Sequence, residues 1–167
     1  MDEATRKTAL RMIPYGIYVL TTRADDGEIG AATVNWVTQT AFSPPLVAIG
    51  VKTDSVTYDV IKKSGHFALN MLGKGQQAMA FAFFRPAEVD GHKLSGEPFV
   101  AGETGAPIIE SAQAAVECKL VEIVELGDHH IVVGEVVNAV VHKTPDGRPD
   151  EAILEMKELG DNVFYGG

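Results

Sequence analysis

The sequence has a single cysteine, Cys118, among its 167 residues. One cysteine cannot form an intramolecular disulfide, and it excludes any metal or iron–sulfur centre built from several thiolates. Cys118 alternates with Glu117 and Lys119 along a β-prone segment. We therefore expect a packed thiol on the inner face of a strand rather than a catalytic nucleophile. So little cysteine is typical of an intracellular protein.

Long hydrophobic runs are absent as well. No stretch approaches the ~20 apolar residues that a membrane-spanning helix needs. The first residues, Met1 to Lys7, are charged and are not followed by the apolar core of a signal peptide. We therefore expect a cytoplasmic protein with no membrane partner.

Basic residues are scarce: 14 Lys and Arg stand against 23 Asp and Glu, which gives a net charge of −9. Binding to nucleic acid requires a contiguous basic surface, so it is not expected. The imbalance is uneven, because residues 1–93 hold 10 basic and 9 acidic residues, whereas residues 94–167 hold the other 4 basic and 14 acidic ones. The N-terminal half can therefore still hold a small phosphorylated ligand.

The common catalytic motifs are missing too. The sequence has no G-x-S-x-G elbow, no phosphate-binding Walker loop, no H-E-x-x-H and no G-x-G-x-x-G that opens a helix. Of the five histidines, only His129 and His130 are adjacent. Neighbouring residues in a strand point to opposite faces, so this pair cannot chelate one metal ion. No metal site is expected.

The sequence predicts a single, mainly β domain over residues 1–167, of which 46% are hydrophobic. Short helices are predicted at 3–12, 55–63 and 76–84, and residues 85–105 are predicted to be loop-rich. Strands are predicted at 17–22, 31–42, 46–51, 66–72, around 116–121 with a bulge at Leu120–Val121, and at 131–141. The strands form hairpins rather than alternating with helices, which favours a closed or half-closed antiparallel barrel.

The segment from Ala32 to Val47 is the most informative. It combines a lone tryptophan with closely spaced polar residues and ends at Pro44–Pro45. A solvated strand face is the simplest interpretation. The density of hydrogen-bonding groups beside Trp36 also suits the wall of a site for a planar heteroaromatic ligand.

In this segment and three others, the sequence resembles the flavin reductase-like family, the FMN-binding split barrels. The segments are T-V-N-W-V-T-Q-T-x-x-S-P-P-L-V at 33–47, V-K-x-x-S-x-T at 51–57, F-A-L-N-M-L at 67–72, and G-D-H with V-G-E-V at 127–136. They occur in order and at family-like spacing over residues 12–142. Residues 83–93 and 162–167 resemble the rubredoxin-linked or flavodiiron-linked subgroup.

The resemblance implies a homodimeric, antiparallel six-stranded Greek-key split β-barrel with a few short helices. It implies noncovalent binding of FMN, or less often FAD, near the dimer interface, and the apolar stretch 79–84 agrees with a dimer contact. Backbone groups of residues 34–41 are expected along the isoalloxazine ring, where donors stabilise reduced flavin. The cofactor-binding residues expected in this segment are Thr33, Val34, Asn35, Trp36, Gln39, Thr40 and Ala41.

Lys52, Ser55 and Thr57 match the family segment that meets the ribityl phosphate. The residues themselves agree, because a serine at a helix N-terminus beside a lysine forms an anion site. A plain helix cap is the alternative for Ser55. Other candidates near the phosphate are Asn70, Arg85 and Lys93, although cations in loops are usually solvated.

His129 matches the G-D-H turn of the family, where the resemblance places a catalytic histidine near the nicotinamide and the flavin. A histidine in a solvated turn is the alternative. The function implied is reduction of FMN by NADH or NADPH, with transfer of electrons to free flavin or to a small redox protein. A noncatalytic FMN-binding electron-transfer module and a lipocalin-type barrel for an apolar ligand are the competing hypotheses. The sequence leaves open the choice between NADH and NADPH and the identity of the acceptor.

Overall fold

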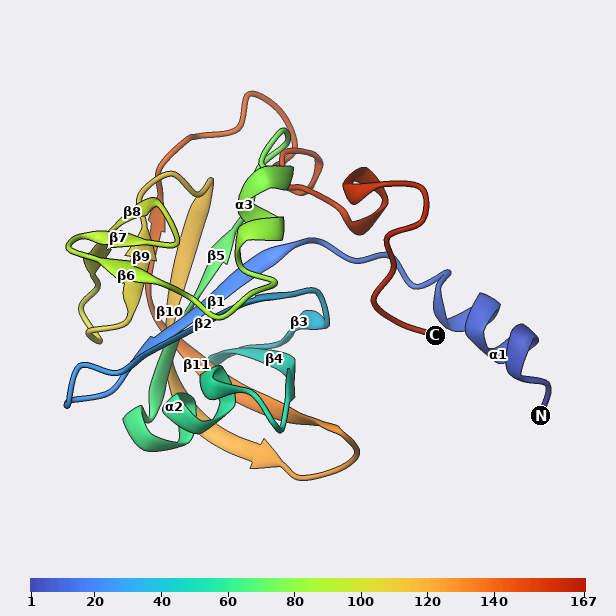
Figure 1. The fold of residues 1–167 in the computed structure, drawn as a ribbon, viewed down its shortest axis with the longest axis horizontal. Coiled ribbons are helices and arrows are strands. Elements are labelled where there is room, and N and C mark those ends of the chain that lie inside the picture. The colour runs from blue at the N-terminus through green and yellow to red at the C-terminus, as the bar shows by residue number, and fades with distance from the viewer.

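The computed structural model describes residues 1–167 and is mainly antiparallel β (Figure 1). The larger sheet has seven strands in the order β2-β1-β5-β10-β11-β4-β3. Their bounds are β1 Tyr18–Arg23, β2 Ile29–Val34, β3 Val37–Phe42, β4 Pro45–Lys52, β5 His66–Met71, β10 Ala114–Val124 and β11 His129–Val141. The smaller sheet has the order β6-β7-β8-β9, with β6 Val89–Asp90, β7 Lys93–Leu94, β8 Glu97–Ala101 and β9 Pro107–Ile109.

The three α-helices are short, as the sequence predicts: α1 Glu3–Leu10, α2 Val56–Ser64 and α3 Gln77–Ala82. Asp2 caps α1 by accepting a hydrogen bond from the Thr5 amide, and Ser55 caps α2 by accepting one from the Tyr58 amide. Gly65 ends α2 in the left-handed conformation, at φ 73°. Local capping therefore fixes where α2 begins and ends.

The expected six strands become seven because the strand predicted over 31–42 is broken at Asn35–Trp36 into β2 and β3. At this corner the Gly50 amide donates to the Trp36 carbonyl at 2.9 Å, in place of a regular ladder. Gly50 leaves room for the indole, since a Cβ there would lie 3.1 Å from a ring carbon of Trp36. β2 and β3 lie at opposite edges of the sheet order, so the corner carries the chain from one edge to the other.

Residues 85–105 are rich in turns, as predicted, but they also contain three short strands that the sequence did not indicate, β6, β7 and β8. Leu94 and Phe99 are buried against α3 and β1, and this burial stabilises an otherwise short sheet. The loop between β8 and β9 covers part of β10, because the Glu103 and Thr104 amides donate to the Glu117 carboxylate, and Glu117 is only 3% exposed. Both register shifts in β10 are bulges or irregularities, one at Glu117/Cys118 and the other at the predicted position, Leu120/Glu122.

Two apolar cores position the candidate site. One includes Leu20, Ile49, Phe67 and Val132 and lies on one face of the large sheet. The other joins β1, α3 and the small sheet. The apolar stretch 79–84 is used largely inside this second core, with Met79, Ala80 and Phe83 buried and only Phe81 and Phe84 exposed.

The last part of the chain contains two 3₁₀ helices, η1 Pro149–Glu151 and η2 Met156–Leu159. The segment 160–167 then runs back beside α1, which projects from the body of the molecule (Figure 1). Arg11 fastens this segment: its Nε donates to the Gly166 carbonyl at 3.2 Å, and its guanidinium lies 4.1 Å from the centre of the Phe164 ring. No helix in the structure is long and apolar enough to cross a membrane.

Candidate functional site

A cavity of about 350 Å³ opens between β2, the end of β4, the end of α3 and the C-terminal segment. Its volume lies within the range of ~300–1,000 Å³ that is usual for small-molecule sites. The lining residues are Ile17, Ala32, Thr33, Val34, Asn35, Gly50, Val51, Lys52, Ser55, Phe83, Phe84, His129, Met156, Val163, Phe164 and Tyr165.

The fold brings six of the predicted site residues to this cavity: Thr33, Val34, Asn35, Lys52, Ser55 and His129. Trp36 stands beside them, with its ring centroid 4.7 Å from that of His129. These residues come from β2, β4, β11 and the start of α2. Residues from distant parts of the chain therefore meet as the sequence predicts.

The β2 wall of the cavity is fixed by α3. The Thr33 hydroxyl donates to the Ala80 carbonyl at 2.7 Å, and the Thr33 amide donates to the Phe83 carbonyl at 3.1 Å. Both bonds hold Phe83 and Phe84 at the rim of the cavity. The wall therefore combines a polar strand backbone with aromatic side chains.

One end of the cavity is suited to an anion. Lys52 is 57% exposed and pairs with Asp54 at 3.2 Å, so its charge is available near the surface. Ser55 begins α2, and the next two amides, of Val56 and Thr57, have no acceptor within the helix. An exposed lysine and a helix N-terminus together attract a phosphate group.

The imidazole of His129 is held on both sides. Its Nδ1 lies 2.9 Å from the Asp128 carboxylate, and its Nε2 lies 2.7 Å from the Tyr165 hydroxyl. The pKa of Asp128 is lowered, mainly by the hydrogen bond from His129. His130 points elsewhere, to the Tyr58 hydroxyl at 2.6 Å, as expected for adjacent strand residues. His129 is therefore an ordered residue of the cavity and not a solvated turn histidine.

Sequence reasoning missed the residues that close the cavity from the C-terminal side, chiefly Phe164 and Tyr165. The Asn35 amide group donates to the Tyr165 carbonyl at 2.9 Å, and the Trp36 and Tyr165 rings are 5.4 Å apart. Only 7% of the residues are aromatic, so the adjacent Phe-Tyr pair in the Gly-rich C-terminal segment was the one sequence signal that could have pointed to these cavity residues. Nothing in the sequence indicated that this ending returns to β2.

Eight predicted cofactor-binding residues lie outside the cavity lining: Trp36, which stands beside it, and Gln39, Thr40, Ala41, Thr57, Asn70, Arg85 and Lys93. Asn70 is fully buried, and its side chain donates to the Val19 carbonyl and the Thr21 hydroxyl and accepts from the Ile109 amide. Thr57 is buried where α2 packs against β2 at Gly30. Their cofactor roles stay predictions.

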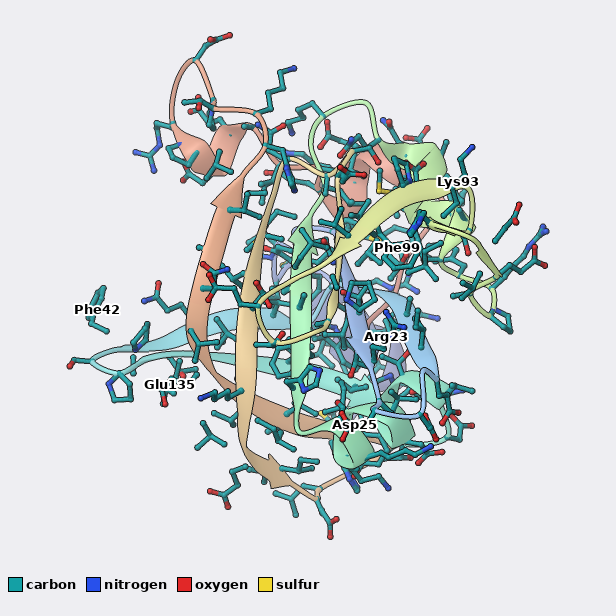
Figure 2. The ribbon with its side chains drawn as sticks, turned by 90° about the vertical axis from the view of Figure 1, so that its left-hand side faces the viewer. Arg23, Asp25, Phe42, Lys93, Phe99 and Glu135 are labelled. Carbon is teal, nitrogen blue, oxygen red and sulfur yellow. The ribbon has the colours of Figure 1, made fainter.

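The exposed members of this group are dispersed. The Gln39, Thr40 and Ala41 segment belongs to β3, in the hairpin whose tip carries Phe42, and Figure 2 shows Phe42 and Lys93 at opposite sides of the molecule. Arg85 and Lys93 are both exposed. The structure therefore leaves Lys52 as the one predicted cation that lines the cavity.

A second cavity, of about 470 Å³, lies between residues 11–15 and the segment 155–166. It shares Met156, Val163, Phe164 and Tyr165 with the first cavity, so the C-terminal segment forms a wall between the two. None of the predicted cofactor-binding or catalytic residues lines the second cavity, so the candidate site is the first.

Comparison with known families matches residues 10–156, nearly the whole chain, to the flavin reductase like domain. The chain belongs to this family. The resemblance carried by the four sequence segments is thereby confirmed.

Several relatives are flavin reductases by name. A flavin reductase of Pseudomonas putida is 32% identical over 136 residues, which cover 81% of this chain and 78% of that protein. A flavin reductase (NADH) of Kitasatospora aureofaciens is 30% identical over 138 residues, which cover 82% and 71%. The diflavin flavoprotein A 1 of Synechocystis is 31% identical, and the match gives loose support to the flavodiiron-linked subgroup.

Solved structures with the same fold include the NADH:FAD oxidoreductase of Streptomyces globisporus, with TM-score 0.71 and 34% identity over 82% of this chain and 81% of that one. An FMN-binding protein of Thermus thermophilus has TM-score 0.68 and 26% identity over 78% and 72% of the two chains. Other relatives are longer: this chain spans 51% of one from Aeropyrum pernix, 42% of one from Rhizobium meliloti and 24% of the Synechocystis protein.

The lining of this flavin reductase-like cavity fits a flavin. Residues 33–35 lie along one wall of the cavity, and Phe83 and Phe84 supply apolar surface for a planar ring. Lys52 and the first turn of α2 offer the complementary charge for a phosphate. A dinucleotide-binding Gly-rich motif is absent, so any nicotinamide substrate is bound by other means.

Proposed function

We propose that this protein is an NAD(P)H-dependent flavin reductase that binds FMN in the cavity beside β2 and passes electrons to free flavin or to a small redox protein. The observation that carries the proposal is the meeting of Lys52, Ser55, His129 and the 33–35 backbone in one cavity of a flavin reductase-like fold. Relatives named for reduction of flavin by NADH support the reaction type. Residues 1–167 are proposed to act as one domain.

FMN is the proposed cofactor. Lys52, Ser55 and the first amides of α2 would hold its phosphate, and the backbone of residues 33–35 would meet the ring edge. The phosphate end supports FMN because a single cation and one helix N-terminus match one terminal phosphate. FAD is the alternative cofactor, because the Streptomyces relative is named an NADH:FAD oxidoreductase.

The flavin would supply the redox chemistry by accepting a hydride from the nicotinamide and releasing electrons to the acceptor. The protein's own residues would bind, orient and shield the two rings. The hydride itself needs no protein base, so His129 is proposed to position the nicotinamide and to balance charge. The aromatic residues Phe83, Phe84 and Phe164 would exclude water from the reacting rings.

A homodimer is also proposed, as the family resemblance implies. Its support in this chain is the β3–β4 hairpin, where Phe42 is 92% exposed and Gln39 and Thr40 are solvent-facing. Size-exclusion chromatography with light scattering tests it: a mass near twice 17.9 kDa supports the dimer, and a mass near 17.9 kDa removes it.

The decisive experiment on the function is an absorbance titration of the purified protein. Apoprotein is mixed with FMN or FAD and the affinity of each is measured, and NADH or NADPH is then added without oxygen. Bleaching of the flavin absorbance at a catalytic rate supports the reductase. Binding of FMN without bleaching by either nucleotide would instead support the noncatalytic electron-transfer module.

A further inference from the structure

Tyr165 touches the site through two different groups. Its hydroxyl lies 2.7 Å from His129 Nε2, and its backbone carbonyl accepts a hydrogen bond from Asn35 Nδ2 at 2.9 Å. Asn35 is 4% exposed, so this second bond is made in a buried setting where an unpaired amide is costly. The chain around Tyr165 is thus fixed to the β2 wall while its hydroxyl reaches the imidazole.

The two contacts of His129 define its tautomer. The Asp128 carboxylate can only accept, so the neutral ring carries its proton on Nδ1 and leaves a lone pair on Nε2. The Tyr165 hydroxyl then donates to Nε2. Burial raises the pKa of Tyr165, with Lys52 opposing and Asp128 and Asp54 reinforcing the shift, so the phenol stays a protonated donor at neutral pH.

The ring of Tyr165 also braces the imidazole sterically. The ring centroids of Tyr165 and His129 are 5.7 Å apart, and both rings pack near Trp36. The segment that carries Tyr165 has a second anchor in Arg11, through the Gly166 carbonyl and the Phe164 ring. The rings of Trp36 and Tyr165 and two hydrogen bonds therefore restrict the position of His129.

We propose that Tyr165 is a positioning residue for His129, which it holds in a single orientation at the edge of the flavin cavity. The inference rests on the proposed function, because it assigns Tyr165 to the residue that would meet the nicotinamide. It adds a residue of the C-terminal segment to the machinery of that site. Tyr165 acts through His129 and not by contact with the reacting atoms.

The first test uses the apoprotein and needs no activity. Two-dimensional ¹⁵N NMR of the imidazoles distinguishes the two neutral tautomers, and the signals of His129 are assigned with His129→Gln. Wild type should show His129 with its proton on Nδ1. In Tyr165→Phe, which keeps the ring but removes the hydroxyl, the Nε2 signal of His129 should shift because this acceptor nitrogen has lost its donor, while the Asp128 carboxylate still holds the proton on Nδ1. Unchanged His129 signals would overturn the proposal.

The second test is a double-mutant cycle on the reduction of bound FMN by NADH, measured by stopped flow without oxygen. Tyr165→Phe should slow reduction about 3- to 10-fold, the effect of one lost hydrogen bond, with FMN affinity unchanged. In the His129→Ala background the same change should have no further effect, because the hydroxyl has lost the group through which it acts.

The outcomes separate the hypotheses. Equal slowing by Tyr165→Phe with and without His129 would mean that the hydroxyl acts independently, which overturns the positioning role. Faster reduction with a lower KM for NADH would mean that the hydroxyl competes with the substrate for Nε2, which also overturns it. If wild type binds FMN but is not reduced by either nucleotide, the proposed function fails, whereas the NMR result still decides the contact between Tyr165 and His129.

Discussion

Lys52 and His129 are direct partners in the antiparallel pairing of β4 with β11, and both side chains line the same cavity. Lys52 is the last residue of β4 and His129 the first of β11, so the ladder that ends there holds a cation and an imidazole at a fixed separation. The candidate phosphate end and the candidate nicotinamide end of the site are therefore tied to one rigid element. This arrangement allows the two ends to be tested separately.

Ser55→Asp tests the phosphate end while it spares the fold. Aspartate caps a helix about as well as serine, so the stability of α2 should be retained. Its charge would repel a phosphate, so FMN affinity measured by fluorescence titration should fall at least 10-fold, while riboflavin, which has no phosphate, should be affected much less. Equal losses for FMN and riboflavin would move the phosphate away from Ser55.

Lys52→Ala combined with Ser55→Ala should weaken FMN binding by ~2–4 kcal/mol, the sum of one charge-assisted and one ordinary hydrogen bond. Isothermal titration calorimetry measures the loss. Lys119→Ala is the matched control, because Lys119 is exposed on β10, outside the cavity lining, and removes the same charge. FMN affinity that stays the same in the double variant would place the phosphate elsewhere.

His129→Ala should slow the reduction of bound flavin by NADH or NADPH and leave FMN affinity within about twofold of wild type, since His129 is proposed to position the nicotinamide. Stopped-flow absorbance gives the rate, and fluorescence titration gives the affinity. His130→Gln is the control, because the adjacent imidazole contacts Tyr58 instead of lining the cavity. An unchanged rate in His129→Ala would confine His129 to a structural role.

Glu117→Gln should destabilise the fold by ~1–3 kcal/mol. The Glu117 carboxylate accepts hydrogen bonds from the amide and hydroxyl of Thr104, the Glu103 amide and the Asn138 side chain. A glutamine would set its NH₂ group against some of these donors and leave them unpaired. Urea unfolding followed by circular dichroism measures the difference, and a loss below about 0.5 kcal/mol would show that the loop rearranges freely.

The Glu117 carboxylate should also make the stability of the fold depend on pH. Burial raises the pKa of Glu117, but the hydrogen bonds from Thr104, Asn138 and Glu103 outweigh it, so the folded-state pKa lies below the ordinary value of 4.5. The stabilising contribution is thus full above about pH 4.5 and is lost as the pH falls through the folded-state pKa. Wild type should lose stability more steeply than Glu117→Gln between about pH 5 and pH 3, and parallel curves would contradict this.

Cys118 should be inert in the folded protein. Burial, with a smaller contribution from the neighbouring Glu117 charge, raises the pKa of the thiol to about 12, so almost no thiolate exists at pH 8. A thiol reagent such as dithionitrobenzoate should release one equivalent of chromophore in urea and almost none in buffer. Rapid release in buffer would indicate that β10 opens locally.

Much of this fold follows from local signals in the sequence. Single residues with local conformational preferences determine where helices begin and end. Examples are the caps at Asp2 and Ser55 and the end of α2 at Gly65, and turn residues act in the same way in the hairpins. The bulge near Leu120 was visible because the apolar alternation changes phase there. Six cavity residues and the neighbouring Trp36 were found through the family-like segments, which are short and contiguous.

The parts that sequence reasoning missed depend on contacts between distant residues. The small sheet exists because Leu94 and Phe99 find a core supplied by α3 and β1, which no local pattern reveals. The burial of Glu117 depends on the loop at 103–104. Asn70 was predicted to lie near the phosphate, but its side chain makes hydrogen bonds within the core. Tyr165 was overlooked for the same reason.

The hydrogen bond from Asn35 to the Tyr165 carbonyl joins positions 130 residues apart, and so closes most of the chain into one loop. Closing a loop of this length costs conformational entropy, which the contacts that the loop makes in the folded protein must offset. The cavity therefore depends on both ends of the loop, because β2 and the C-terminal segment each supply part of its lining. A flavin bound there would report that the two distant parts of the chain have docked.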